Sequence, residues 1–381
     1  MKTLFFGIFI LWANIVCSQD KRGYFWMFGD SMSINFNQTP IQVDTNVIHC
    51  KGEKGSFAIC DTAGNLLLVG GQKETRTTNN QDTMNQTSFN YSVWLADGTL
   101  LDSAFSGHHI LPVTFPENPG IVYLLQNYHS ASGSLILYSK IDVINRVVLY
   151  KNKYIHGHIS STSNLYTNLY YGLGVLLKHG NGRDFWYITL AHQADPGTTH
   201  KIFKTLVTPD SVMFVDSTTF CGNLSSYPDI FNHATHLGYD KNGCRLFMIG
   251  GANDIWVFEF DRNTGQHSPC FTMKIEPPDS ILPQGTVGSA KSLAVSNSGK
   301  YLYVAHLFQS NTGIHFQKKI ILQYDLSLAT PQLIKQHAKT VWVRNGIDSL
   351  VLFINKTPTG KIVFHQFELV TGYAYINGIL T

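Results

Sequence analysis

One short pattern recurs along most of this chain and constrains its fold more than any other feature. It consists of a strand with alternating apolar residues, a polar turn that contains Gly, and a second strand of the same kind. Gly, Asn and Asp tolerate the positive φ that tight hairpin turns require. Hairpins that share this pattern predict a repeat architecture. The six clearest copies are FAICDTAGNLLLVGG (57–71), VWLADGTLLD (93–102), LLKHGNGRDFWYITL (176–190), LGYDKNGCRLFMIGG (237–251), LAVSNSGKYLYVAHL (293–307) and FINKTPTGKIVFHQF (353–367).

The spacing of these hairpins indicates the fold class. Successive copies start about forty to about eighty residues apart, which suits one or two four-stranded blades of a propeller. Further strand pairs follow at 254–265 and 319–327, and no helical period occurs after the N-terminal leader. Only 14% of residues are charged and 13% are aromatic, a composition that suits strands better than solvated helices. We therefore predict an all-β protein with a single β-propeller of about seven four-stranded blades.

The N-terminus has the pattern of a secretory signal peptide. Lys2 precedes an apolar run at 4–16, which is too short to span a bilayer, and the chain becomes polar after Cys17. We predict a leader at 1–18 that is cleaved before Gln19, with the propeller domain at 19–381. A lipid-anchored Cys17 is the alternative. The mature protein is expected to be secreted or held at the cell surface, with no membrane span.

The end of the chain leaves two alternatives for the last blade. Only fourteen residues, 368–381, follow the last hairpin. Either residues 22–28 close that blade, as N-terminal strands often do in propellers, or the chain is truncated.

Several segments resemble a known family in their order along the chain. WMFGDSMSINF (26–36) resembles the opening of the WD-repeat-like surface β-propellers of gliding-motility-associated and type IX-secreted bacterial proteins. The resemblance implies an exported propeller and supplies no catalytic residues. Further matches are the 57–71 hairpin, NPGIVYLLQNY (118–128), HGNGRDFWYIT (179–189), FEFDRNTGQ (258–266) and the SNSGKYLYVA…ILQYDL pair (296–326).

The preferred function at this point is a non-enzymatic scaffold. Propellers present the loops of all blades on one rim, so we expect a monomer that binds protein or glycan at the cell surface. A net charge of +3 without a basic stripe argues against nucleic acid. On this interpretation the chain has no catalytic residue, no cofactor and no metal.

The alternative function is a secreted hydrolase. Gly29-Asp30-Ser31 resembles the opening of the SGNH (GDSL) esterases, and Gly251-Ala252-Asn253-Asp254 resembles their Asn-containing block. Such an esterase needs its Ser at a strand-to-helix turn, with a His and an Asp behind it. The residues after Ser31 have no helical period, so we expect a turn and a strand there. A propeller enzyme with an axial active site is the other form of this alternative.

The remaining candidate sites have simpler structural explanations. His156 and His158 share a strand face and could ligate a metal, but no acidic or cysteine partner is near in sequence. The other close histidine pairs are His108 with His109 and His233 with His236. Strand-end carboxylates are expected to form Asx turns rather than calcium sites. These carboxylates are Asp61, Asp240, Asp261 and Asp325.

Aromatic side chains and cysteines are the last candidate functional residues in the sequence. Core packing between blades is the expected role of the aromatic cluster, with sugar stacking as the alternative. Cys50 with Cys60 and Cys244 with Cys270 are conceivable disulfides, and sequence leaves the connectivity open, with Cys221 remaining. The aromatic residues are Tyr166, Tyr170, Tyr171, Phe185, Trp186 and Tyr187.

Overall fold

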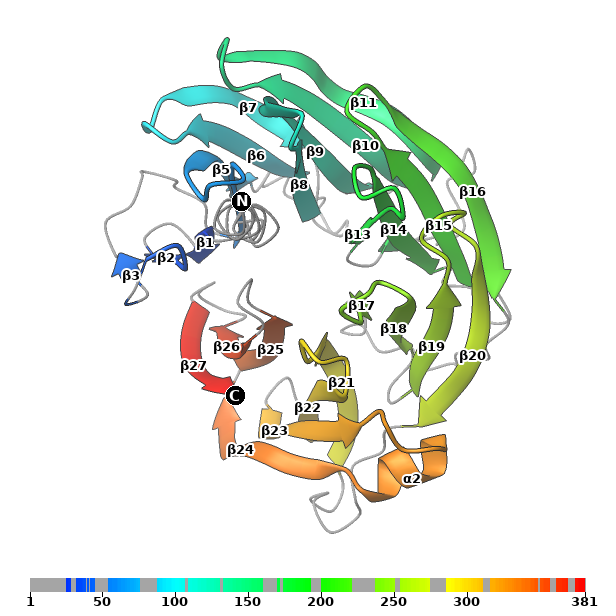
Figure 1. Ribbon diagram of the computed structural model, residues 1–381. Coiled ribbons are helices and arrows are strands. Elements are labelled where there is room, and N and C mark those ends of the chain that lie inside the picture. The colour runs from blue at the N-terminus through cyan, green and yellow to red at the C-terminus, as the bar shows by residue number, and fades with distance from the viewer. Residues whose placement is uncertain are drawn as a thin grey trace, which may run out of the picture.

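The computed structural model shows a chain built almost entirely of antiparallel strands. In the described residues the strands form seven sheets, which we name blades A to G in chain order (Figure 1). The structure describes residues 25–28, 32–38, 40, 42–44, 54–75, 88–106, 109–130, 133–159, 170–171, 174–192, 200–220, 237–250, 254–274, 286–310, 316–348, 350–356, 361–368 and 374–380.

The first three blades come from the N-terminal part of the chain. Blade A contains β1 (Phe25–Phe28), β2 (Met32–Asn35) and β3 (Gln42–Asp44). Blade B contains β4 (Lys54–Cys60), β5 (Leu66–Thr75), β6 (Ser88–Leu95) and β7 (Leu100–Ser106). Blade C contains β8 (His109–Phe115), β9 (Asn118–Ser130), β10 (Gly133–Asp142) and β11 (Val147–Ile159).

The last four blades follow in the same order. Blade D contains β12 (Tyr170–Tyr171), β13 (Val175–Lys178), β14 (Phe185–His192), β15 (His200–Val207) and β16 (Val212–Phe220). Blade E contains β17 (Leu237–Tyr239), β18 (Arg245–Gly250), β19 (Asp254–Phe260) and β20 (His267–Lys274). Blade F contains β21 (Thr286–Val295), β22 (Tyr301–Ser310), β23 (Phe316–Asp325) and β24 (Lys339–Asp348). Blade G contains β25 (Leu350–Lys356), β26 (Ile362–Glu368) and β27 (Ala374–Leu380).

The blades are arranged around a common axis, as Figure 1 shows. First strands of successive blades contact each other, β4 with β8, β17 with β21 and β21 with β25, so these strands lie innermost. Strands β7, β11, β16, β20 and β24 end their sheets on the outer side. This arrangement confirms the predicted propeller of about seven blades.

The predicted hairpin turns have the expected backbone. Five of the turn glycines lie in the described residues, and each has a positive φ, as tight hairpins require. Gly360, in the sixth turn, lies outside the described residues. The φ values are 92° at Gly64, 82° at Gly98, 74° at Gly182, 66° at Gly243 and 73° at Gly299.

The hydrophobic core lies between neighbouring blades. From blade B to blade G, the facing surfaces of neighbouring sheets are apolar and pack against each other. The cluster between blades E and F, for example, joins Phe247 and Val257 to Leu302, Val304 and Tyr324. Equivalent clusters join blades B and C, C and D, D and E, and F and G.

One feature differs from the sequence expectation. A short helix, α2 (Pro331–Gln336), follows β23, although no helix was expected after the leader. Thr330 caps it by accepting a hydrogen bond from the Leu333 N–H, and Pro331 begins it. Strand β1 pairs with β2 in blade A, and the closure of the last blade by residues 22–28 stays a prediction.

Candidate functional site

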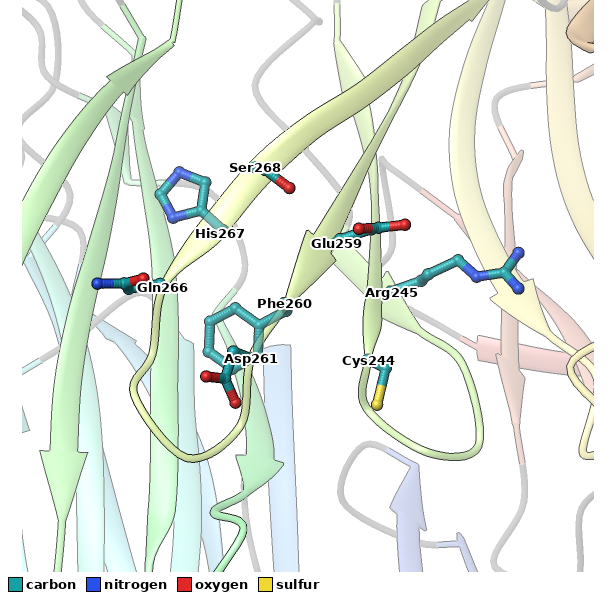
Figure 2. Close-up of a pocket in the computed structure, with 8 residues that line it drawn as sticks. All are labelled: Cys244, Arg245, Glu259, Phe260, Asp261, Gln266, His267 and Ser268. Carbon is teal, nitrogen blue, oxygen red and sulfur yellow. The ribbon is translucent and has the colours of Figure 1, made fainter.

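A cavity of about 430 Å³ opens in blade E, where the chain turns from β17 into β18 and from β19 into β20. Side chains of both charge signs gather there, together with a hydroxyl and a thiol (Figure 2). We call this cavity the blade E pocket. Its lining residues are Cys244, Arg245, Glu259, Phe260, Asp261, Gln266, His267 and Ser268.

Strand pairing brings three of these residues into one row. Arg245 of β18 lies directly opposite Glu259 of β19, and Glu259 lies opposite Ser268 of β20. Directly opposite residues of an antiparallel pair project to the same face of the sheet. Figure 2 shows these three side chains extending to the same side of the blade.

The two carboxylates at the turns, Asp240 and Asp261, accept hydrogen bonds from their own turns. Asp240 Oδ1 accepts the N–H groups of Cys244 at 2.8 Å and Arg245 at 3.1 Å. Asp261 Oδ1 accepts the Asn263 N–H at 2.9 Å. Asp261 Oδ2 accepts the hydroxyl of the next residue, Thr264, at 2.8 Å. The hydrogen bonds from Asn263 and Thr264 hold the pKa of Asp261 below its usual value. These groups therefore shape the pocket rather than react in it.

The side chains of Glu259 and Arg245, in contrast, are unengaged, by which we mean that they hold no ion pair and no side-chain hydrogen bond in the described structure. Both side chains are exposed. Within the part of the chain that the structure describes, neither makes an ion pair or a side-chain hydrogen bond, although they are neighbours on adjacent strands. A carboxylate in this state can accept a proton, and a guanidinium can donate to an anion or an oxyanion. The blade E pocket thus offers a base and an anion partner.

His267 belongs to the other face of the blade, toward blade D. Its ring packs edge-on against Phe258 at 5.8 Å, and Figure 2 shows it directed away from Glu259. The buried Lys204 of blade D pairs with Asp216 at 2.8 Å. Burial, and then the positive charge of Lys204, lower the pKa of His267. His267 is therefore neutral at pH 7 and adds no charge to the joint between blades D and E.

Blade D also fixes the turn that forms one wall of the pocket. The indole Nε1–H of Trp186 donates to the Arg262 carbonyl oxygen at 2.8 Å. The Gly180 N–H donates to the same oxygen at 3.0 Å. Gly265 lies against the Trp186 ring, where a Cβ would come within 2.7 Å of it. The β19–β20 turn is therefore held in one position relative to blade D.

The residues of the esterase hypothesis do not form such a site. Gly29, Asp30 and Ser31 lie outside the described residues. The next strand, β2, begins at Met32, so no helix follows the Ser as an esterase of that kind needs. The segment 251–253 joins the paired strands β18 and β19, the position that we expected for a turn.

The histidines show packing roles where the structure describes them. His156 stacks on Phe214 with 4.1 Å between ring centroids. The side chains of His109 and His158 lie outside the description, as do residues 108, 233 and 236. Among the described residues, no group of three or more His, Cys, Asp or Glu could hold a metal ion.

The Asx turns are confirmed. The carboxylates of Asp61, Asp261 and Asp325 each accept the N–H of the residue two positions on, at 2.9 Å, while Asp240 accepts from residues further along its turn. Of the aromatic cluster, Trp186 and Tyr187 are buried and the half-buried Phe185 packs with the C–D cluster, which confirms the core role for these three. Tyr166 and the side chains of Tyr170 and Tyr171 lie outside the description.

The cysteine pairing is tested only in part. Cys244 is an exposed free thiol, so the conceivable Cys244–Cys270 disulfide is not formed. Cys50 and Cys221 lie outside the described residues, which leaves the Cys50–Cys60 pair a prediction. Within the described residues, no helix is long and apolar enough to cross a bilayer.

The pairing of Arg245 with Glu259 was missed by the sequence reasoning. Arg245 and Glu259 are fourteen positions apart, and only strand pairing makes them neighbours. A signal existed in the segment FEFDRNTGQ (258–266), which stood out as a family-like segment and supplies four of the eight lining residues.

Comparison with known proteins supports the fold. No family model matches the chain, and no curated protein matches it in sequence. Among solved structures, a candidate 6-phosphogluconolactonase from Bacteroides uniformis is similar, with a TM-score of 0.51 and 12% identity over 93% of this chain and 95% of that one. The periplasmic gluconolactonase PpgL of Pseudomonas aeruginosa has a TM-score of 0.49 and 12% identity, over 94% of each chain. The Cps50 (Swd1) β-propeller domain of Myceliophteria thermophila has a TM-score of 0.42 and 10% identity, over 94% of this chain and 97% of that one.

The similarity to the Bacteroides uniformis structure supports the β-propeller fold and bears on the functional expectation. We expected a non-enzymatic binding scaffold, but the similar structure from Bacteroides uniformis is named as a candidate 6-phosphogluconolactonase. That finding contradicts both the scaffold function and the expectation of no enzymatic activity. The blade E pocket lies within one blade, whereas the propeller-enzyme alternative expected an axial site.

Proposed function

We propose that this protein is a β-propeller hydrolase that opens a cyclic ester of a sugar acid. The observation that carries the proposal is the unengaged pair of Glu259 and Arg245 at the blade E pocket. The substrate class is suggested by the name of the similar propeller from Bacteroides uniformis, since a gluconolactone is the internal ester of a sugar acid. The pocket's own chemistry, a base beside an anion partner, suits the hydrolysis of an ester.

The reaction assigns a separate role to each residue. The Glu259 carboxylate takes a proton from a water molecule, and the water oxygen bonds to the lactone carbonyl carbon. Negative charge then develops on the carbonyl oxygen, to which the Arg245 guanidinium donates. The ring C–O bond breaks, and the leaving alkoxide takes the proton back from Glu259. The product is the open-chain hydroxy acid.

The specificity of the pocket for a sugar can be argued from its lining. Gln266 and Ser268 add polar groups to the walls, beside the turn that Asp261 holds. Amide and hydroxyl groups exchange hydrogen bonds with sugar hydroxyls. Phe260 is buried at the back of the pocket and supplies an apolar surface.

A substrate survey tests the proposal. Purified protein is mixed with the δ-lactone of gluconic acid or with an acyclic ester of similar size, and acid release is followed above the spontaneous rate. We expect faster hydrolysis of the lactone and a loss of about a hundredfold in kcat for Arg245→Gln. The matched control is Arg146→Gln on the surface of blade C, where Arg146 pairs with Asp97. A lactone rate equal to the spontaneous rate would reject the proposed function.

We further propose that this enzyme acts outside the cytoplasm. The support is the predicted leader at 1–18 and the family-like order of the segments, which favours a surface protein of the gliding-motility-associated, type IX-secreted kind. N-terminal sequencing of the secreted protein should find Gln19 first. Recovery of the full chain only inside the cells would contradict this location.

A further inference from the structure

His306 lies in the middle of β22, a strand of blade F that is labelled in Figure 1. Its partners on the neighbouring strands are Ala290 and Ile320, and both belong to the apolar cluster that joins blades E and F. Met273 reaches the same cluster from blade E. His306 has 0% exposure, and within the described residues neither of its ring nitrogens has a hydrogen-bond partner.

An imidazole in this position tolerates only one charge state. A buried polar group without a partner already costs free energy, and a buried charge costs far more. Burial lowers the pKa of His306 to about 3, and no charged neighbour contributes to that shift. The charged residues on the strands packed around it are Lys318, Lys319 and Asp325 on β23, Arg245 on β18 and Glu259 on β19, together with Asp254, Lys274 and Lys291, whose side chains lie outside the description.

We propose that the joint between blades E and F is an acid-sensitive element of the fold, which loosens when His306 takes up a proton. The unfolded chain binds this proton near pH 6.5, whereas the folded chain resists it down to about pH 3. The contribution of the neutral His306 to stability is therefore complete above about pH 6.5. This contribution is lost as the pH falls from 6.5 toward 3. The folding equilibrium constant then decreases about tenfold for each pH unit.

The position of this joint gives the acid response a consequence for the blade E pocket. Arg245 and Glu259 project from the same sheet that supplies Phe247 and Val257 to the joint. Loosening of the joint removes contacts that hold this sheet against blade F. This consequence rests on the proposed function, whereas the acid sensitivity itself does not.

A stability measurement on the full chain tests the proposal without any assay of activity. Urea unfolding is measured at pH 7, 6, 5 and 4 for the wild type and His306→Phe, which keeps an aromatic ring and removes the titration. We expect the folding equilibrium constant of the variant, relative to the wild type, to rise about a hundredfold between pH 6 and pH 4. His337→Gln, at the exposed end of α2, is the control and should follow the wild type. Equal pH dependence of His306→Phe and wild type would overturn the proposal.

A second measurement covers the case in which His306→Phe fails to fold. Exchange of the histidine C2 hydrogen in the wild type, read by mass spectrometry, reports the titration and the accessibility of each ring. We expect His306 to exchange far more slowly than His337 and to titrate well below pH 6. Titration of His306 near pH 6.5 would overturn the proposal.

Discussion

Substitution of Gly265 tests how firmly the β19–β20 turn is held against blade D. Gly265 has φ 72°, and an added Cβ would lie 2.7 Å from the ring of Trp186. The ring cannot retreat easily, because it is 3% exposed and its Nε1–H is bonded to the Arg262 carbonyl. The left-handed backbone costs Ala about 1–2 kcal/mol, and forcing the packed ring aside adds about 1–3 kcal/mol. We therefore expect Gly265→Ala to lower the free energy of unfolding by about 2–5 kcal/mol.

Gly299 provides the matched control for this substitution. Its φ is 73°, almost the same, but in the described structure no neighbouring atom lies within 4 Å of its Cβ position. Gly299→Ala should therefore cost only the backbone part, about 1–2 kcal/mol. Urea unfolding followed by circular dichroism compares the two variants, and tryptophan fluorescence should shift only in Gly265→Ala. Equal losses of stability would refute the argument that Trp186 holds this turn.

Two further substitutions test the joints between blades. Tyr187→Phe removes a buried hydroxyl that donates to Asn127 Oδ1 at 2.6 Å, so the melting temperature should fall by the equivalent of about 1–3 kcal/mol; an unchanged melting temperature would contradict this role. Glycine tolerates the positive φ of 51° at residue 152, so Asn152→Gly leaves the backbone unstrained. The substitution removes the side-chain oxygen that accepts hydrogen bonds from the Ser106 N–H and from the Gln126 amide, each at 3.0 Å. Hydrogen exchange of the Ser106 amide should then accelerate at least tenfold, about 1.4 kcal/mol of lost protection, and unaltered protection would count against the contact.

The fold was predictable from the sequence because its signals are local. Each turn glycine lies within a hairpin of about fifteen residues, and alternation fixes which side chains face the neighbouring blades. The helix α2 was not predicted, because six residues are too few to show a helical period. Thr330 followed by Pro331 is nevertheless a helix start signal that could have located it.

The pocket was much harder to predict, because its chemistry depends on pairing between strands. The local sequence identified Asp261 as a turn carboxylate, which the structure confirms, but it gave no sign that Glu259, two positions earlier, is unengaged. Likewise, Arg245 becomes the neighbour of Glu259 only through the register of β18 and β19. His306 is similar, because a histidine on a strand shows no sign in sequence of being completely buried.

The role of Glu259 is the central claim of the proposed function, and one kinetic comparison tests it most directly. Glu117, an exposed carboxylate in the turn between β8 and β9, provides the control. Lactone hydrolysis is measured for Glu259→Gln and Glu117→Gln, with circular dichroism to confirm that both variants fold. We expect Glu259→Gln to lose about a hundredfold or more in kcat, the typical contribution of a general base, and Glu117→Gln to match the wild type. A Glu259→Gln variant with the wild-type rate would contradict the account.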